Sequence, residues 1–169
     1  FIHRRHAVRS LVALGLGTLA FSMEEVLLEP YGGEVLKLSV SDTTRLTATL
    51  ALGSLLGFGL ASRVLSRGAD PFRMAAQGAV VGVPAFLAVI IAGPTGSPLL
   101  FGFGTLLIGF GVGLFSHGTL TAGMQLAPDD QTGLALGAWG AVQASAAGLG
   151  MALGGILRDV TSGTGPQTV

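Results

Sequence analysis

Five apolar runs, each about 20 residues or longer, account for most of the chain and constrain its fold more than any other feature. They cover residues 7–28, 44–65, 74–93, 98–126 and 132–157. A helix needs about 20 consecutive apolar residues to cross the hydrocarbon core of a bilayer. The connectors between the runs are short and rich in glycine, proline and aspartate, the residues typical of turns. The sequence therefore predicts an all-α integral membrane protein with five transmembrane helices.

The composition excludes several classes of function. Half of the 169 residues are hydrophobic and 11% are charged, against about a quarter charged in a soluble domain. The net charge is zero, whereas a nucleic-acid interface requires a clustered basic excess. No nucleophile triad or phosphate-binding loop is recognisable in the sequence. We therefore expect neither a nucleic-acid partner nor an enzyme with a catalytic site.

Arginines mark one side of the predicted bundle. Short cytoplasmic loops of membrane proteins retain lysine and arginine, so both arginine clusters should lie on the cytoplasmic side. The Phe1 end of the chain is then cytoplasmic. The first cluster is also expected to bind anionic lipid headgroups. The clusters are Arg4, Arg5 and Arg9 before the first run, and Arg63, Arg67 and Arg73 around the second connector.

An odd number of spans places the two ends of residues 1–159 on opposite sides of the membrane. Residues 160–169 are rich in glycine, threonine, serine and proline and too short to cross again. They are expected to form a polar loop that leads to a missing helix. Six-helix halves are the repeat units of the major facilitator fold. The sequence therefore predicts five helices of such a half.

Three carboxylates stand near the end of the first apolar run. A carboxylate at membrane depth is costly unless it is paired, neutralised or turned toward an aqueous or ligand-filled interior. Glu25 and Glu29 are four residues apart and share a helix face, while Glu24 is turned away. Pro30 is expected to end the helix. Arg45 opens the next span on the same side, which predicts an ion pair with Glu25 or Glu29; contact with a ligand, proton transfer and exposure to solvent are the alternatives.

A second polar group is expected at the last hairpin. His117 lies ten residues before Ala127 and Gln143 lies ten residues after Gly133, so both should be about 15 Å from the turn and near the middle of the membrane. His117 is predicted either to hydrogen-bond across helices, with Gln143 as a partner, or to bind the magnesium of a tetrapyrrole as an axial ligand. Trp139 is predicted either to stack on such a tetrapyrrole ring or to pack within the helix bundle.

Glycine is unusually frequent, with 28 residues. Small residues let membrane helices approach closely. The pairs Gly53 with Gly57 and Gly109 with Gly113 have the spacing of such contacts. The last span carries small residues along one edge, namely Gly133, Gly137, Ala141 and Ser145, with Gly140, Ala144 and Gly148 beside them. They predict either tight helix packing or a groove that admits a flat ligand.

Two blocks of sequence stand out as motifs. The first reads MEEVLLEPYGG at residues 23–33 and continues with TTRLTA at 43–48. The second reads HGTLTA at 117–122, GLALGAWGAVQA at 133–144 and GGILRD at 154–159. Together they resemble the PucC family of light-harvesting complex assembly proteins, the bacteriochlorophyll delivery branch of the major facilitator superfamily. The resemblance extends over nearly the whole chain and implies helices seven to eleven of a twelve-helix protein.

The same resemblance implies a function. The family helps antenna complexes of the LH1 or LH2 type to assemble in the bacterial intracytoplasmic photosynthetic membrane. It would bind or deliver bacteriochlorophyll, or chaperone antenna polypeptides, in contact with lipid and with the reaction centre–antenna complex. A proton-coupled transporter of a porphyrin-like solute and a structural subunit of a photosynthetic supercomplex are the alternatives. The candidate pigment contacts are His117, Gln143, Trp139, Glu25 and Glu29.

Overall fold

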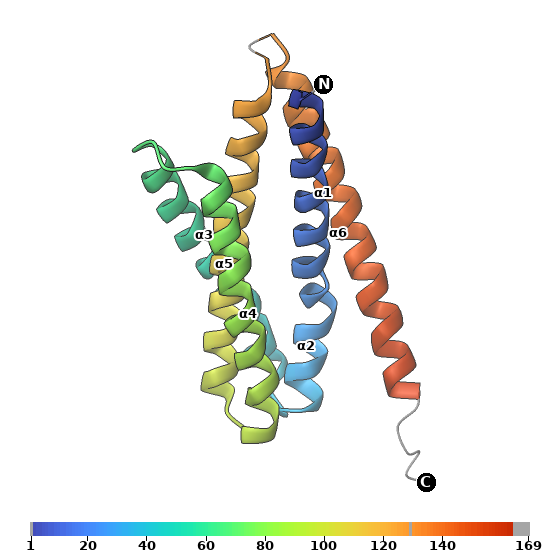
Figure 1. Ribbon diagram of the computed structural model, residues 1–169. Coiled ribbons are helices and arrows are strands. Elements are labelled where there is room, and N and C mark those ends of the chain that lie inside the picture. The colour runs from blue at the N-terminus through green and yellow to red at the C-terminus, as the bar shows by residue number, and fades with distance from the viewer. Residues whose placement is uncertain (1, 129, 164–169) are drawn as a thin grey trace.

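Long helices that run up and down make up the whole described fold. The computed structural model describes the backbone of residues 2–128 and 130–163, and the side chains of these residues except 2–5, 25 and 161–163. They form six helices and no strand: α1 (Ile2–Ser22), α2 (Glu24–Glu34), α3 (Val40–Leu65), α4 (Pro71–Thr95), α5 (Pro98–Leu126) and α6 (Thr132–Gly163) (Figure 1). Within this part of the chain, five segments are long and apolar enough to cross a membrane, with α1 and α2 in one of them. The predicted all-α fold with five spans is confirmed.

The helix boundaries follow capping residues as well as hydrophobicity. α5 has the predicted bounds, residues 98–126. α3 begins before the apolar run because the hydroxyl of Ser39 accepts a hydrogen bond from the backbone N–H of Asp42 at 3.2 Å. Asp70 caps α4 in the same way, by accepting from the N–H of Phe72 at 2.9 Å. Polar N-terminal turns therefore lengthen the helices beyond their apolar parts.

The polar loop expected at residues 160–169 does not begin at residue 160. α6 continues to Gly163, so residues 160–163 are helical. Threonine, serine and glycine weaken a helix only modestly, and the proline that would interrupt it stands at position 166. Residues 164–169 lie outside the described residues, and the further helix that the sequence analysis expects stays a prediction.

The first span is interrupted at Met23, and its helix does not end at Pro30 as predicted. Met23 separates α1 from α2, and α2 continues through Pro30 to Glu34. A proline has no N–H and so leaves the carbonyl four residues earlier, that of Val26, without its helical donor. The break lies about one turn before Val26. A proline disfavours the helical conformation of the residue before it, but this is only a preference. Here the packing of the following residues against α4 outweighs it.

α5 is the central helix, and glycines bring its backbone close to those of α3 and α4. A methyl group added at Gly53 of α3 would overlap the carbonyl oxygen of Leu106, and one at Gly109 of α5 would overlap that of Leu50. Towards α4, a methyl group at Gly118 would come within 2.6 Å of the backbone nitrogen of Ala75. The predicted packing role of Gly53 and Gly109 is confirmed.

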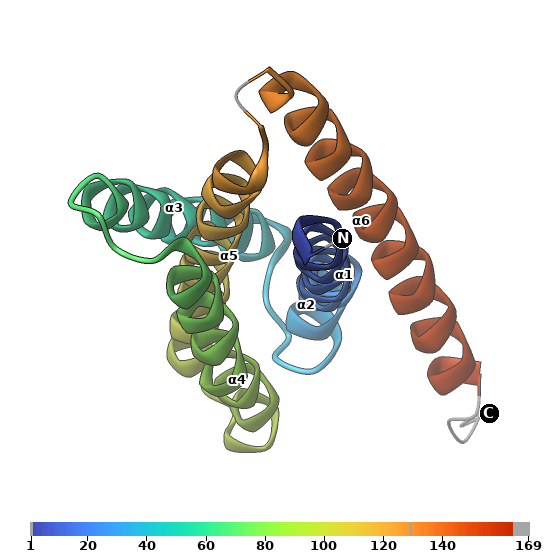
Figure 2. The same ribbon diagram turned by 45° about the horizontal axis from the view of Figure 1, so that its top comes forward.

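α6 has a different environment, because it packs mainly against α1 and runs obliquely away from α5 (Figure 1 and Figure 2). The glycines that allow its contact with α1 are Gly150, beside the carbonyl of Leu19, and Gly154, beside that of Met23. Four other glycines of α6 have no atom within 4 Å of an added methyl group: Gly133, Gly137, Gly140 and Gly148. Much of the predicted small-residue edge of α6 therefore faces open space.

The arginine clusters lie at one end of the bundle. The connection between α3 and α4, with Arg63, Arg67 and Arg73 in or beside it, is at the same end as the start of α1 (Figure 1). We call it the arginine-bearing end. Arg9 is exposed there, while the side chains of Arg4 and Arg5 lie outside the described residues. Binding of these three arginines to lipid headgroups stays a prediction.

Candidate functional site

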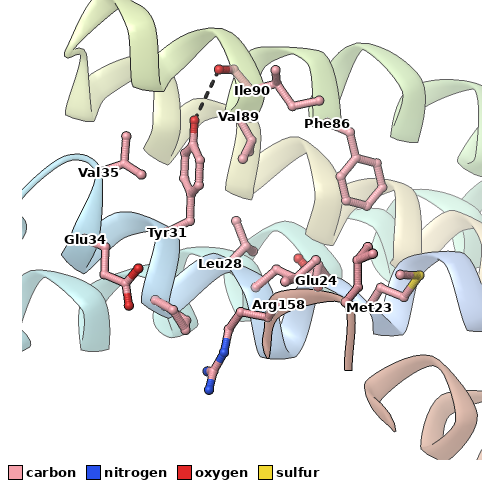
Figure 3. A pocket seen from close by; sticks show the side chains of 13 residues that line it. Met23, Glu24, Leu28, Tyr31, Glu34, Val35, Phe86, Val89, Ile90 and Arg158 are labelled. Atoms are coloured by element: carbon pink, nitrogen blue, oxygen red, sulfur yellow. Dashed lines mark hydrogen bonds between the residues drawn. The ribbon is translucent and has the colours of Figure 1, made fainter. Parts of the chain in front are cut away.

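Glu24 and Glu34 of α2 border a cavity at the end of the bundle opposite the arginine-bearing end. The cavity has a volume of about 420 Å³ and lies between α2, α4 and the end of α6 (Figure 3). Glu24 is 4% exposed, although it begins α2 within a membrane span. The lining is otherwise mostly apolar and consists of Met23, Leu27, Leu28, Pro30, Tyr31, Glu34, Val35, Phe86, Val89, Ile90, Leu157 and Arg158. A buried carboxyl group in such surroundings is a functional candidate.

Tyr31 joins α2 to α4 beside this cavity. Its hydroxyl donates to the carbonyl oxygen of Ile90 at 3.3 Å (Figure 3), and its ring stacks on Phe101 with centroids 5.8 Å apart. Pro94 has no N–H, so the carbonyl of Ile90 would otherwise have no donor within the helix. Sequence reasoning missed this contact. The signal that could have found it is Pro94, which predicts an unpaired carbonyl four residues earlier.

The predicted ion pair between Glu29 and Arg45 is wrong. Arg45 instead pairs with Asp42 of its own helix at 2.9 Å, and Glu29 accepts a hydrogen bond from the hydroxyl of Thr47 at 3.1 Å. Asp42 is one turn before Arg45, and the hydroxyl of Ser39 already holds its carboxylate in place. Forming the local pair therefore costs less side-chain conformational entropy than forming a pair between two helices. The side chain of Glu25 lies outside the described residues. The hydrogen bond from Thr47 therefore links α2 to α3 in place of that ion pair.

His117 and Gln143 lie at a similar depth but face different neighbours. The ring of His117 meets Phe58 of α3 edge-on, with centroids 5.6 Å apart and an interplanar angle of 81°. Gln143 instead lines a groove between α1, α5 and α6. Neighbouring residues on a helix point about 100° apart, so Ser116 rather than His117 faces this groove. The predicted pairing of His117 with Gln143 is therefore wrong, and magnesium ligation by His117 stays a prediction.

Trp139 connects α6 to α5. Its indole N–H donates to the hydroxyl of Thr119 at 3.3 Å. It also lines a cavity of about 240 Å³ near the arginine-bearing end, together with Ser10 and Leu14 of α1. The described contact is a helix-to-helix hydrogen bond. Stacking on a pigment ring stays a prediction for this side chain.

The groove that Gln143 lines holds four neutral polar side chains near the middle of the spans. We call it the mid-span groove; its volume is about 320 Å³. Thr18, Ser22 and Ser116 are 8%, 8% and 9% exposed. Within the described part of the chain, none of these side chains, nor that of Gln143, hydrogen-bonds to another protein group. None of their polar atoms is fully enclosed without a partner, so these atoms reach the open space of the groove. The remaining lining residues are Phe21, Val112, Phe115, Gly140, Ala144 and Ala147.

Sequence reasoning identified Gln143 but not this cluster. Thr18 and Ser22 are four residues apart in the first apolar run, which places both on one helix face. That spacing is the signal that could have identified them. The groove contains no charged side chain. Among the described residues, no group of three or more histidine, aspartate and glutamate side chains could hold a metal ion.

Comparison with known proteins places the chain in a family. A family model described as PUCC protein matches residues 1–167. The chain belongs to the PucC family. Protein PucC of Cereibacter sphaeroides is 58% identical over 98% of this chain and 38% of its own length. Protein PucC of Rhodovulum sulfidophilum is 59% identical over 94% of this chain and 35% of its own length.

A third relative carries a different name. The protein called "Uncharacterized protein in puhA-bchM intergenic region" of Rhodobacter capsulatus is 50% identical over 92% of this chain and 33% of its own length. The chain thus spans little more than a third of the curated PucC relatives that it matches. No solved structure matches it.

Proposed function

We propose that this chain is part of a membrane protein that helps bacterial light-harvesting antenna complexes of the LH1 or LH2 type to assemble. The protein binds bacteriochlorophyll and delivers it to antenna polypeptides, or chaperones those polypeptides. The observation that carries this proposal is membership of the PucC family over residues 1–167. The two motif blocks, MEEVLLEPYGG and GLALGAWGAVQA, support the same role by resemblance.

The geometry of the described residues supports binding rather than catalysis. The cavity beside Glu24 is mostly apolar, and the mid-span groove offers neutral hydroxyl and amide groups. The residues that line the mid-span groove include no acidic or basic side chain beside its hydroxyl groups. A hydroxyl group that acts as a nucleophile needs a neighbouring base to activate it. Sites between the helices of a bundle commonly bind apolar ligands and cofactors. The proposed role is accordingly non-enzymatic.

The proposed location is the intracytoplasmic photosynthetic membrane, with the Phe1 end on the cytoplasmic side. The support is the arginine-bearing end, because short cytoplasmic loops of membrane proteins retain arginine. Antenna polypeptides, bacteriochlorophyll and lipid are the proposed partners. The reaction centre–antenna complex is the proposed place of assembly.

The test of this role is removal of the gene from a phototrophic host, followed by near-infrared absorption of its membranes. Antenna absorption should fall while free pigment synthesis continues, and the full-length gene should restore it. Normal antenna absorption in the deletion strain, with no related gene to compensate, would contradict the proposed role.

A second candidate function is proton-coupled transport of a porphyrin-like solute, which the burial of Glu24 favours. Carboxyl groups within spans commonly serve as proton relays in transporters. The discriminating measurement is pH-driven uptake of a porphyrin by vesicles that contain the full-length protein. We expect no protein-dependent uptake. Uptake that Glu24→Gln abolishes and Glu29→Gln preserves would favour transport instead.

A further inference from the structure

The threonine hydroxyl groups of α5 have partners within their own helix. Thr105, Thr119 and Thr121 of α5 donate to the carbonyl four residues earlier, each at 2.9 Å. Thr18 and Ser22 of α1, each 8% exposed, make no such bond among the described residues. The groove hydroxyls therefore remain available to a molecule in the groove. Water in lipid-exposed surroundings is scarce, so the partner at this depth is a bound ligand or water confined to the groove.

The walls of the mid-span groove restrict the shape of that ligand. One side is formed by the rings of Phe21 and Phe115, with centroids 5.8 Å apart and planes at 49°. The other side is the small-residue face of α6, with Gly140 and Ala144. An added methyl group at Gly140 meets nothing within 4 Å. Aromatic rings opposite small side chains suit a flat ligand.

The polar groups restrict its chemistry. The Gln143 amide offers two N–H donors, and each hydroxyl offers one. Since no charged side chain lines the groove, a neutral ligand is favoured over an ion. Carbonyl oxygens are the matching acceptors for these donors, and bacteriochlorophyll carries keto and ester carbonyl groups around its ring.

We infer that the mid-span groove binds one edge of a bacteriochlorophyll ring through its peripheral carbonyl oxygens, with Gln143 and the groove hydroxyls as donors. This inference rests on the proposed function and assigns the pigment a site. His117 faces α3 and takes no part in this contact. Recognition by hydrogen bonds to the ring edge leaves the magnesium available to a ligand from an antenna polypeptide.

The first test uses a substitution whose side chain fills the groove. The full-length protein is purified in mild detergent from a host that makes bacteriochlorophyll, and the pigment content per polypeptide is measured. Gly140→Leu should reduce the pigment content about tenfold or more, a loss of about 1.4 kcal/mol in binding. The matched control is Gly148→Leu on the same helix, because neither position has an atom within 4 Å of an added methyl group. Equal pigment content in the two variants would overturn the inference.

A second variant keeps the groove open and removes a donor. Gln143→Leu should move a carbonyl stretching band of the bound pigment, in resonance Raman spectra, to its frequency without a hydrogen bond. The control Gln131→Leu, at the exposed turn before α6, should leave that band unchanged. Retained pigment with an unchanged band in Gln143→Leu would overturn the assignment of Gln143. Loss of pigment in His117→Leu, with normal content in Gly140→Leu, would assign the pigment to His117 instead.

The outcomes separate this inference from the proposed function. Wild-type protein with pigment, and Gly140→Leu equal to its control, would overturn the groove site and leave the assembly role standing. Wild-type protein without pigment would overturn the groove site as well. Only normal antenna formation in the deletion strain would overturn the assembly role itself.

Discussion

The two sides of α5 use glycine in opposite ways. Toward α3 and α4, glycines such as Gly53 and Gly109 bring helix backbones so close that no side chain fits between them. On α6, an added methyl group at Gly137 or Gly140 meets no atom within 4 Å, and Gly140 lines the mid-span groove beside α5. We call these the closed side and the open side. The difference teaches that glycine content alone does not reveal packing, since the same residue closes one interface and leaves room at the other.

The hydroxyl groups follow the same division. On α5, Thr105 is fully buried and bonds its own helix through the carbonyl of Phe101. In the mid-span groove, Thr18 and Ser22 make no such bond within the described residues. Satisfied polar groups stabilise a rigid contact, whereas unsatisfied groups beside a cavity suit binding. The closed side thus supports the fold, and the open side carries the proposed ligand contacts.

The largest expected effect would break the closed side. Gly109→Leu places a side chain against the backbone of Leu50, and overpacking of this kind costs about 1–3 kcal/mol or more. We expect the full-length variant to lose its monodisperse elution and to melt at a lower temperature. The control on the open side is Gly137→Leu, for which no atom lies within 4 Å of the added Cβ. If both variants are equally stable, the division into two sides is wrong.

A smaller effect is expected where α2 meets α4. Tyr31→Phe removes the hydroxyl that serves the carbonyl of Ile90 but keeps the ring stacked on Phe101. The loss should be about 1 kcal/mol, which thermal unfolding in detergent can detect. Adding Pro94→Ala to the Tyr31→Phe variant restores a backbone N–H at position 94, which can donate to the carbonyl of Ile90. The double variant should therefore recover part of the lost stability. A Tyr31→Phe variant as stable as the wild type would show that the hydrogen bond contributes nothing.

The smallest effect concerns Arg45. Its pair with Asp42 is local and exposed, and such pairs contribute little to stability because water and salt screen them. Arg45→Ala should therefore change the melting temperature less than Tyr31→Phe does. A large loss, comparable to that of Gly109→Leu, would instead support the ion pair between helices that the sequence suggested. Glu25→Gln, measured beside it, would then identify the partner.

The spans could be predicted from sequence because hydrophobic length relates directly to membrane thickness. α5 has the predicted bounds, and the family was recognisable from its motifs. The helix faces could not be predicted in the same way. His117 and Gln143 share a depth, which depends on residue count, but their directions depend on the rotation and tilt of each helix. α6 leans away from α5, so equal depth did not bring the two side chains together (Figure 2).

Competition from a nearby residue explains why Arg45 does not pair as predicted. The sequence offered Arg45 two kinds of partner, a carboxylate on the preceding helix and Asp42 one turn away. The capping contact of Ser39 with Asp42, at 2.7 Å between side-chain oxygens, favours the local one. Likewise, the contact of Tyr31 depends on a carbonyl that Pro94 leaves without a donor. The Arg45–Asp42 pair and the Tyr31 hydrogen bond each depend on a further residue, Ser39 or Pro94, that a prediction made one span at a time does not take into account.

The most direct test of the central claim is the absorption spectrum of the full-length wild-type protein, purified in mild detergent from a bacteriochlorophyll-producing host and free of antenna polypeptides. We predict a near-infrared bacteriochlorophyll band in a fixed ratio to the polypeptide, which persists through size-exclusion chromatography. A monodisperse, folded preparation without that band would contradict the claim that the open side of this bundle binds pigment.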